Sequence, residues 1–188
     1  MSIHLFMFYT AYAKTWSPDP AFQAELGRTL GHSLAAQHLV VGLLSLILGW
    51  LVDWKGNRVV LRGLCAAMTG VPIAAVLIGG ALPSNDTRLL FLPALYGLIG
   101  CMPVMSRVMA NYILEIAPPE RQTLYVGMLG LAPAATLPFP VIVGSAAMGL
   151  QTLTDEKSAY EIAFAACGAL FFLSVYFSWR ISEPRHRM

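Results

Sequence analysis

The side chains best able to do chemistry in this sequence lie within one long apolar stretch. Arg107, Asn111 and Glu115 are spaced four residues apart, so they share one face of a helix, and Tyr96 and Gly100 project onto roughly the same face. An arginine beside an amide and a phenol is suited to binding an anionic group in a water-filled cavity. The alternative interpretation is that Arg107 pairs with a carboxylate on a neighbouring helix and never contacts a solute.

His38 is a second candidate for chemistry, in another apolar stretch. An imidazole has an ordinary pKa of about 6.5, so His38 is able to bind a coupling proton near neutral pH. A hydrogen-bonded histidine in a helix core is the alternative. Glu25, Arg28 and His32 precede it at helical spacing, which is typical of a solvated helix end.

No pattern typical of catalysis or metal binding accompanies these residues. The sequence contains no catalytic serine motif, no metal-spaced histidine pair and no phosphate-binding loop, and all three cysteines lie within apolar runs. We therefore expect neither an enzyme nor a metal or cofactor. The net charge of +2, with scattered basic residues, also argues against a nucleic-acid partner.

The elements that must position these residues are apolar helices. Hydrophobic residues make up 57% of the chain and charged residues 12%, whereas soluble domains carry about a quarter charged residues. Five stretches are long enough to cross the roughly 30 Å hydrocarbon core of a lipid bilayer as helices. The sequence predicts an all-α, polytopic transmembrane helical bundle. It forms a single domain over residues 1–188, with spans at about 21–52, 59–82, 89–116, 122–150 and 160–180.

The start of the chain departs from this pattern. Residues 1–13 are apolar and aromatic but too few to cross a bilayer, so they are predicted to form a partial helix. A re-entrant or interfacial stretch is the alternative. Asp19 is placed to cap the next helix, and Pro20 fits its first turn.

The fourth predicted span, residues 122–150, contains Pro133, Pro138 and Pro140 within eight residues. Each proline removes a backbone hydrogen bond, so this helix is predicted to be broken. Transporters use broken helices to line central sites or to bend between states. A passive structural kink is the alternative.

Basic residues are unevenly divided between the two sides of the predicted bundle. One side receives seven: Lys55, Arg58, Arg62, Arg121, Arg180, Arg185 and Arg187. The other side receives four: Lys14, Arg28, Arg88 and Lys157. The excess predicts that the first side, with the carboxyl terminus, faces the cytoplasm. We expect an integral protein of a bacterial-type inner membrane.

A tight basic loop joins the first two complete spans. Gly49 allows close approach of helices, Asp53 lies at a helix end, Gly56 permits the turn, and Arg58 anchors the next helix at the headgroups. This loop resembles the Gly-x-x-x-Asp-Arg-x-Gly-Arg-Arg loop of the major facilitator superfamily. Gly49, Asp53, Gly56 and Arg58 match. Basic positions of the pattern are replaced at 54, 57 and 59. The weakened match favours the position between the eighth and ninth helices of that family.

Two further elements resemble the same family in the matching order. The run from Glu115 to Arg121 is similar to the Glu-x-x-Pro-x-x-x-Arg element between the tenth and eleventh helices, and its two ends are placed to form an ion pair across the turn. The residues 182–185, Ser-Glu-Pro-Arg, are similar to the short tail after the twelfth helix. The resemblance covers nearly the whole chain, as the carboxyl-terminal half of a twelve-helix fold.

The resemblance implies a secondary transporter, or permease, that moves a small solute by alternating access, with coupling to protons left open. It assigns the loop of Gly49, Asp53, Gly56 and Arg58 to conformational change rather than solute contact. The partner it implies is a missing amino-terminal six-helix half, in the same gene or a separate chain. A gene fragment or a misassigned start is the expected origin, and this half alone is not expected to transport. A non-transporting membrane scaffold or assembly subunit is the alternative function.

Overall fold

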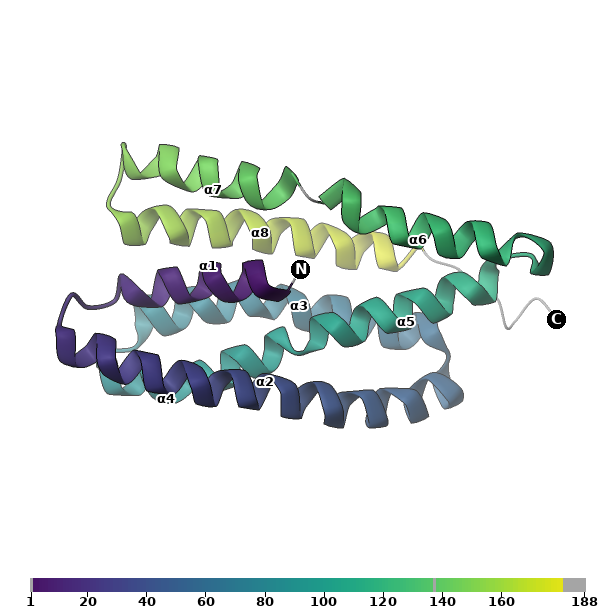
Figure 1. The fold of residues 1–188 in the computed structure, drawn as a ribbon, viewed down its shortest axis with the longest axis horizontal. Coiled ribbons are helices and arrows are strands. Elements are labelled where there is room, and N and C mark those ends of the chain that lie inside the picture. Colours follow the sequence, from purple (N-terminus) through teal and green to yellow (C-terminus); the bar gives the residue numbers. More distant parts are fainter. Residues whose placement is uncertain (1, 137, 181–188) are drawn as a thin grey trace.

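The computed structural model describes residues 2–136 and 138–180, and the regular structure of these residues is helical throughout (Figure 1). The elements in order are α1 (Ser2–Lys14), α2 (Pro20–Lys55), α3 (Asn57–Ala81), α4 (Asn85–Ile99), α5 (Cys101–Ile116), the 3-10 turn η1 (Pro119–Arg121), α6 (Gln122–Thr136), α7 (Pro138–Gln151) and α8 (Glu156–Ser178). The helices lie side by side along the long axis of the bundle. The predicted all-α class is therefore confirmed.

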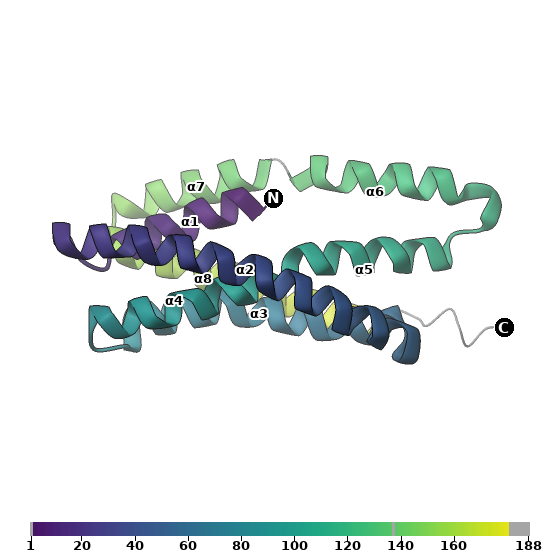
Figure 2. The ribbon, with the colours of Figure 1, turned by 60° about the horizontal axis from the view of Figure 1, so that its bottom comes forward.

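Four helical segments of the described chain are long and apolar enough to cross a membrane. They are α2, α3, the combined segment Asn85–Ile116, and α8. This agrees with four of the five predicted spans and fits an integral membrane protein. The fifth predicted span, 122–150, contains two shorter helices, α6 and α7, which lie end to end along one edge of the bundle (Figure 2). Residue 137, between them in the sequence, lies outside the described residues, so the fifth span remains a prediction.

The helices begin where side chains satisfy their free N–H groups. The Asp19 carboxylate accepts a hydrogen bond from the Ala21 N–H at 3.0 Å, with Pro20 in the first turn of α2, as predicted. Ser84 Oγ accepts from the Thr87 N–H at 3.2 Å and so starts α4 ahead of its apolar run. Asp155 caps α8 in the same way through Ser158.

The opening helix α1 packs inside the bundle. Tyr9, Tyr12 and Ala13 are buried, and the ring of Tyr9 stacks on Phe164 of α8 with centroids 4.7 Å apart. Aromatic packing of this kind anchors α1 to the long helices. Residues 2–14 are thus helical, and whether they are part of a span or an interfacial stretch stays a prediction.

Helix α2 approaches the end of α4 closely at two glycines. A Cβ added at Gly100 would lie 2.9 Å from the carbonyl oxygen of Gln37, and one at Gly97 would lie 3.3 Å from a methyl of Val40. Gly100 also separates α4 from α5. A Cβ added at Gly49 would meet no described atom within 4 Å, so its expected role in close helix approach stays a prediction. Small residues such as Gly97 and Gly100 let the backbones of two neighbouring helices approach closely.

Candidate functional site

A polar pocket of about 300 Å³ lies between the carboxyl-terminal half of α2 and α5. Its polar lining comes from Ser45 and Asp53 of α2 and from Arg107 and Asn111 of α5. Apolar residues, including Val104 of α5, complete the wall. Residues four and eight apart on a helix share a face, so each helix presents one polar stripe to this pocket. Polar side chains from two apolar helices are thereby brought together.

Arg107 is held toward α2 by a serine. Its Nη1 donates to Ser45 Oγ at 3.3 Å, while the Ser45 hydroxyl donates to the backbone carbonyl of Val41 at 2.7 Å. The serine thus acts as an acceptor for the guanidinium while its own hydrogen is used within α2. The Arg107 side chain is exposed at the pocket, so further N–H groups are available to a ligand or to a covering protein surface.

A carboxylate and an amide lie along the same pocket. Asp53 is in the last turn of α2 and Asn111 is one turn after Arg107, and both are exposed. The pocket therefore carries a positive charge, a negative charge and a neutral donor–acceptor group along two neighbouring helices. These side chains can bind an anionic group at Arg107 and Asn111. They can also bind a zwitterionic group that extends from Arg107 to Asp53. From the sequence, Asp53 was predicted to belong to the loop motif, with no link to Arg107.

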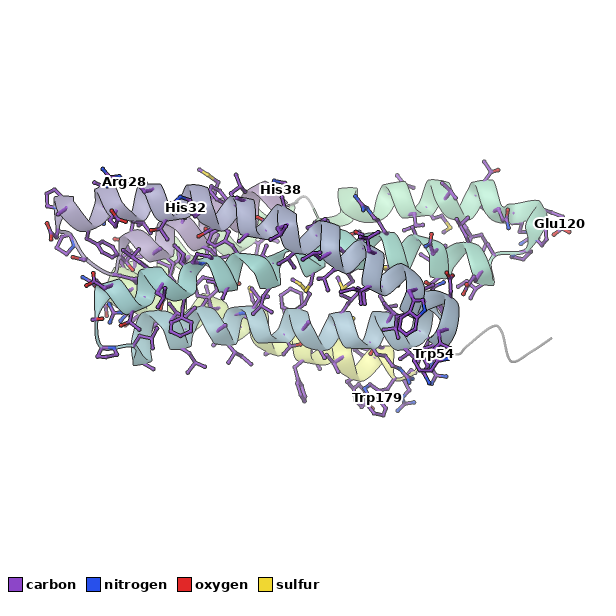
Figure 3. All side chains as sticks on the ribbon, turned by 90° about the horizontal axis from the view of Figure 1, so that it is seen from below. Arg28, His32, His38, Trp54, Glu120 and Trp179 are labelled. Atoms are coloured by element: carbon purple, nitrogen blue, oxygen red, sulfur yellow. The ribbon has the colours of Figure 1, made fainter. Side chains whose placement is uncertain are left out.

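Two other predicted cavity residues lie elsewhere. Tyr96 is fully buried, and its hydroxyl is 3.0 Å from the hydroxyl of Thr10 on α1. It precedes Arg107 by eleven residues, or about 16 Å along a helix. His38 is exposed on α2, on the same helix as Arg28 and His32 (Figure 3). Neither side chain lines the pocket of Arg107.

The loop motif forms the predicted tight turn. Gly56 has a φ of 88°, a conformation that disfavours side chains, and its N–H donates to the Val52 carbonyl at 2.9 Å to close α2. Arg58 follows in the first turn of α3 and is partly buried.

The second motif lies around the turn between α5 and α6. Glu115 is in the last turn of α5 and Arg121 is in η1, and both are exposed. The predicted ion pair between them stays a prediction.

One polar cluster inside the bundle was missed from the sequence. The Tyr12 hydroxyl donates to Glu161 Oε1 of α8 at 3.0 Å, and Lys157 Nζ lies 3.7 Å from the same oxygen. Glu161 is the second residue of the span predicted at 160–180, so an ionisable residue inside an apolar run was the available signal. Its position on α8, far from the pocket lining, indicates a structural link between α1 and α8.

Among the residues that the structure describes, no group of three or more His, Cys, Asp or Glu side chains is placed to hold a metal ion. Comparison of the chain with protein-family models, with curated proteins and with solved structures finds no match. The fold and the pocket therefore define the general class of this protein and no particular family. The chain is an all-helical protein with several helices long and apolar enough to span a membrane, and it carries an arginine-containing polar pocket between two of them.

Proposed function

We propose that this chain is part of a secondary transporter, a permease for a small solute that works by alternating access. The observation that carries the proposal is the placement of Arg107 with Ser45, Asn111 and Asp53 in a pocket between two membrane-length helices. An arginine in the middle of a membrane helix costs about 2.5–3.5 kcal/mol on insertion scales, so such residues usually bind a solute, an ion or a specific partner.

The chemistry of the pocket favours an anionic or zwitterionic solute. Arg107 and Asn111 offer N–H donors one helical turn apart, which suits a carboxylate or phosphate. Asp53 at the other end of the pocket would accept from an ammonium group of a zwitterion. A volume of about 300 Å³ is at the small end of ligand sites, which suits a metabolite of few atoms.

The same pocket is open on one side. Arg107, Asn111 and Asp53 are all exposed. Large apolar residues of α2 near Asp53 in the sequence, including Leu46 and Trp50, are exposed as well. We propose that a second helical unit, in the same polypeptide or in a separate chain, covers this face and completes the solute site. This agrees with the resemblance to one half of the major facilitator fold, in which solute binds between two halves.

The distribution of basic residues supports an orientation. Figure 1 shows the α2–α3 turn and the α5–α6 turn at one end of the bundle, and the turns before α2, α4 and α8 at the other. The first end carries Lys55, Arg58, Arg62, Arg121 and Arg180. We propose that this end faces the cytoplasm and that the host membrane is a bacterial-type inner membrane.

Solute binding can be tested on the purified chain by thermal unfolding in detergent with succinate, lactate, glycerol 3-phosphate and glutamate. We expect at least one of these solutes to raise the midpoint, and Arg107→Ala to abolish the rise. Arg88→Ala is the matched control, because it removes the same side chain at the opposite end of the bundle, away from the pocket. If no anion stabilises the wild-type chain, either alone or purified together with the unit that covers the pocket, the assignment of Arg107 to solute binding fails.

Transport needs a second measurement in the cell that carries the gene. Deletion of the gene should reduce uptake of the stabilising solute, and wild-type protein should restore uptake while Arg107→Ala should not. Solute binding with unchanged uptake in the deletion strain would contradict transport and favour a non-transporting scaffold.

A further inference from the structure

An apolar groove lies between α3 and α8, away from the polar pocket. It has a volume of about 670 Å³, and its walls include Thr69, Pro72 and Val76 of α3 and Gly168, Ala169 and Leu173 of α8. The hydroxyl of Thr69 donates to the carbonyl of Cys65 at 3.1 Å, so it presents no free donor to the groove. Gly168 and Ala169 lack bulky side chains, and their small size opens the groove beside Pro72. Its lining matches the chemistry of a hydrocarbon chain.

A basic and aromatic cluster lies on the same two helices, toward their cytoplasmic end in the proposed orientation. Arg62 donates from Nε to the Ser178 carbonyl at 3.0 Å and from Nη2 to the Trp179 carbonyl at 2.8 Å. Its guanidinium carbon lies 5.2 Å from the Trp179 ring centroid. Arg180 donates to the Tyr176 hydroxyl at 3.1 Å. We call these residues the α3–α8 cluster: Arg62, Tyr176, Trp179 and Arg180.

The α3–α8 cluster has unused capacity for an anion. The two bonds of Arg62 use two of the five N–H groups of a guanidinium. Neither Arg62 nor Arg180 forms an ion pair with a carboxylate among the described residues. Two arginines held close to the end of α8 therefore form a positive site that no described acidic side chain neutralises.

The α3–α8 cluster lies in line with the groove and at headgroup level. Arg62 precedes Thr69 by seven residues and Trp179 follows Leu173 by six, so both lie about 10 Å beyond the groove along antiparallel helices. Trp179 is 68% exposed and lies at the same end of the bundle as Trp54 (Figure 3). Exposed tryptophans and basic residues gather at the membrane–water interface. The opposite end of α8 instead has the paired charges Lys157 and Glu161.

We propose that this face binds one glycerophospholipid with an anionic headgroup, whose phosphate is held by Arg62 and Arg180 and whose acyl chain lies in the groove. The groove gives the site its affinity for an acyl chain. The two arginines select an anionic lipid from the proposed cytoplasmic leaflet. The proposal requires a membrane setting but does not depend on transport.

The test is native mass spectrometry of the full chain from micelles that contain equal amounts of phosphatidylglycerol and phosphatidylcholine with identical acyl chains. The wild-type chain should retain phosphatidylglycerol with a preference of about tenfold or more, as two basic residues at an anionic surface predict. Arg62→Gln with Arg180→Gln should lower the ratio to about one. Arg88→Gln is the matched control, because Arg88 also donates to a backbone carbonyl, that of Leu82, at 3.1 Å and 3.0 Å. It should keep the preference.

A bulky side chain placed in the groove provides a second test of the proposal. Ala169→Phe should reduce retention of both lipids several-fold, whereas Ala166→Phe, an exposed position of α8 outside the groove, should not. Arg180→Gln alone covers the case in which the double variant does not fold, because the exposed Arg180 side chain bonds only to Tyr176 among the described contacts. This single variant should lower the ratio partially. Equal retention of the two lipids by the wild type, or equal effects of the two phenylalanines, would overturn the proposal. Binding of free glycerol 1-phosphate as tight as the lipid would also overturn it.

Discussion

Arg107 of α5 donates to Ser45 of α2 at 3.3 Å, and this contact joins the two helices that form the polar pocket. The serine accepts one N–H group of the guanidinium, and the exposed side chain keeps others free for a second acceptor. A hydrogen bond from a charged donor is worth about 1.5–3 kcal/mol when buried and less when water competes. The contact therefore orients Arg107 rather than neutralising it.

Arg107→Lys keeps the charge but loses the planar arrangement of donors that binds a carboxylate or phosphate through two bonds. We expect solute affinity to fall about tenfold or more, with a further loss in Arg107→Ala. Ser45→Ala should weaken binding less, because the arginine loses its orientation but stays in place. Isothermal titration of the purified chain with the stabilising solute measures this order, and an Arg107→Ala chain with wild-type affinity would refute it.

Membrane topology can be tested at the two ends of the bundle. In a background without the three native cysteines, Lys55→Cys and Asp86→Cys place single thiols at exposed positions before α3 and at the start of α4. A membrane-impermeant maleimide should label them from opposite sides of sealed vesicles, with Lys55→Cys on the cytoplasmic side. Labelling of both from one side would show that α3 does not cross.

The link between α1 and α8 should contribute to stability. Tyr12→Phe removes the 3.0 Å hydrogen bond to Glu161 and leaves a half-buried carboxylate with Lys157 as its remaining described partner. We expect a loss of about 1–2 kcal/mol in the free energy of unfolding. Tyr176→Phe removes an exposed hydroxyl and is the control, expected to change stability by less than about 0.5 kcal/mol. Unfolding of both variants in mixed detergent measures the difference.

The first turn of α8 should depend on pH. The Ser158 hydroxyl and N–H both donate to Asp155, and these bonds lower the pKa of its carboxyl below the usual value. Because the folded-state pKa is below the unfolded one, the cap stabilises α8 fully above the unfolded pKa and is lost as pH falls through the folded pKa. Amide exchange in the first turn of α8, corrected for intrinsic rates, should be protected at pH 6 and lose protection in Asp155→Ala. An unchanged rate in that variant would contradict capping.

The sequence predicted the helices well because lipid leaves few alternatives. Apolar length, the Asp19 cap and the Gly56 turn are local properties, and the cap, the turn and four of the five long apolar segments were found as predicted. The site was predicted only in part. Helical spacing placed Arg107 and Asn111 on one face, but spacing within one helix cannot show which residues of α2 face them.

Helix packing explains what the sequence could not show. The crossing at Gly97 and Gly100 sets where α2 meets α4, and it places Ser45 and Asp53 against α5 while His38 stays exposed. Tyr96 shares the face of Arg107 by helical spacing, yet it meets α1 because α1 fills that end of the bundle. Contacts between distant segments decide these positions, and no local pattern encodes them.

The same crossing can be tested by comparing a glycine that lies in it with one that does not. A Cβ at Gly100 would lie 2.8 Å from the Gly97 carbonyl oxygen and 2.9 Å from that of Gln37, and neither backbone can yield without moving a helix. We therefore expect Gly100→Ala to lower the free energy of unfolding by about 1–3 kcal/mol, in the range of overpacked cores. Gly49 lies inside α2, where a Cβ would meet no atom of the described residues within 4 Å. Gly49→Ala should thus raise stability by about 0.5–1 kcal/mol through helix propensity alone.

Changes of opposite sign in the free energy of unfolding of the two variants, measured in detergent, support the crossing. Destabilisation by Gly49→Ala would mean that another helix packs at that position, and a neutral Gly100→Ala would show that α2 and α4 cross elsewhere.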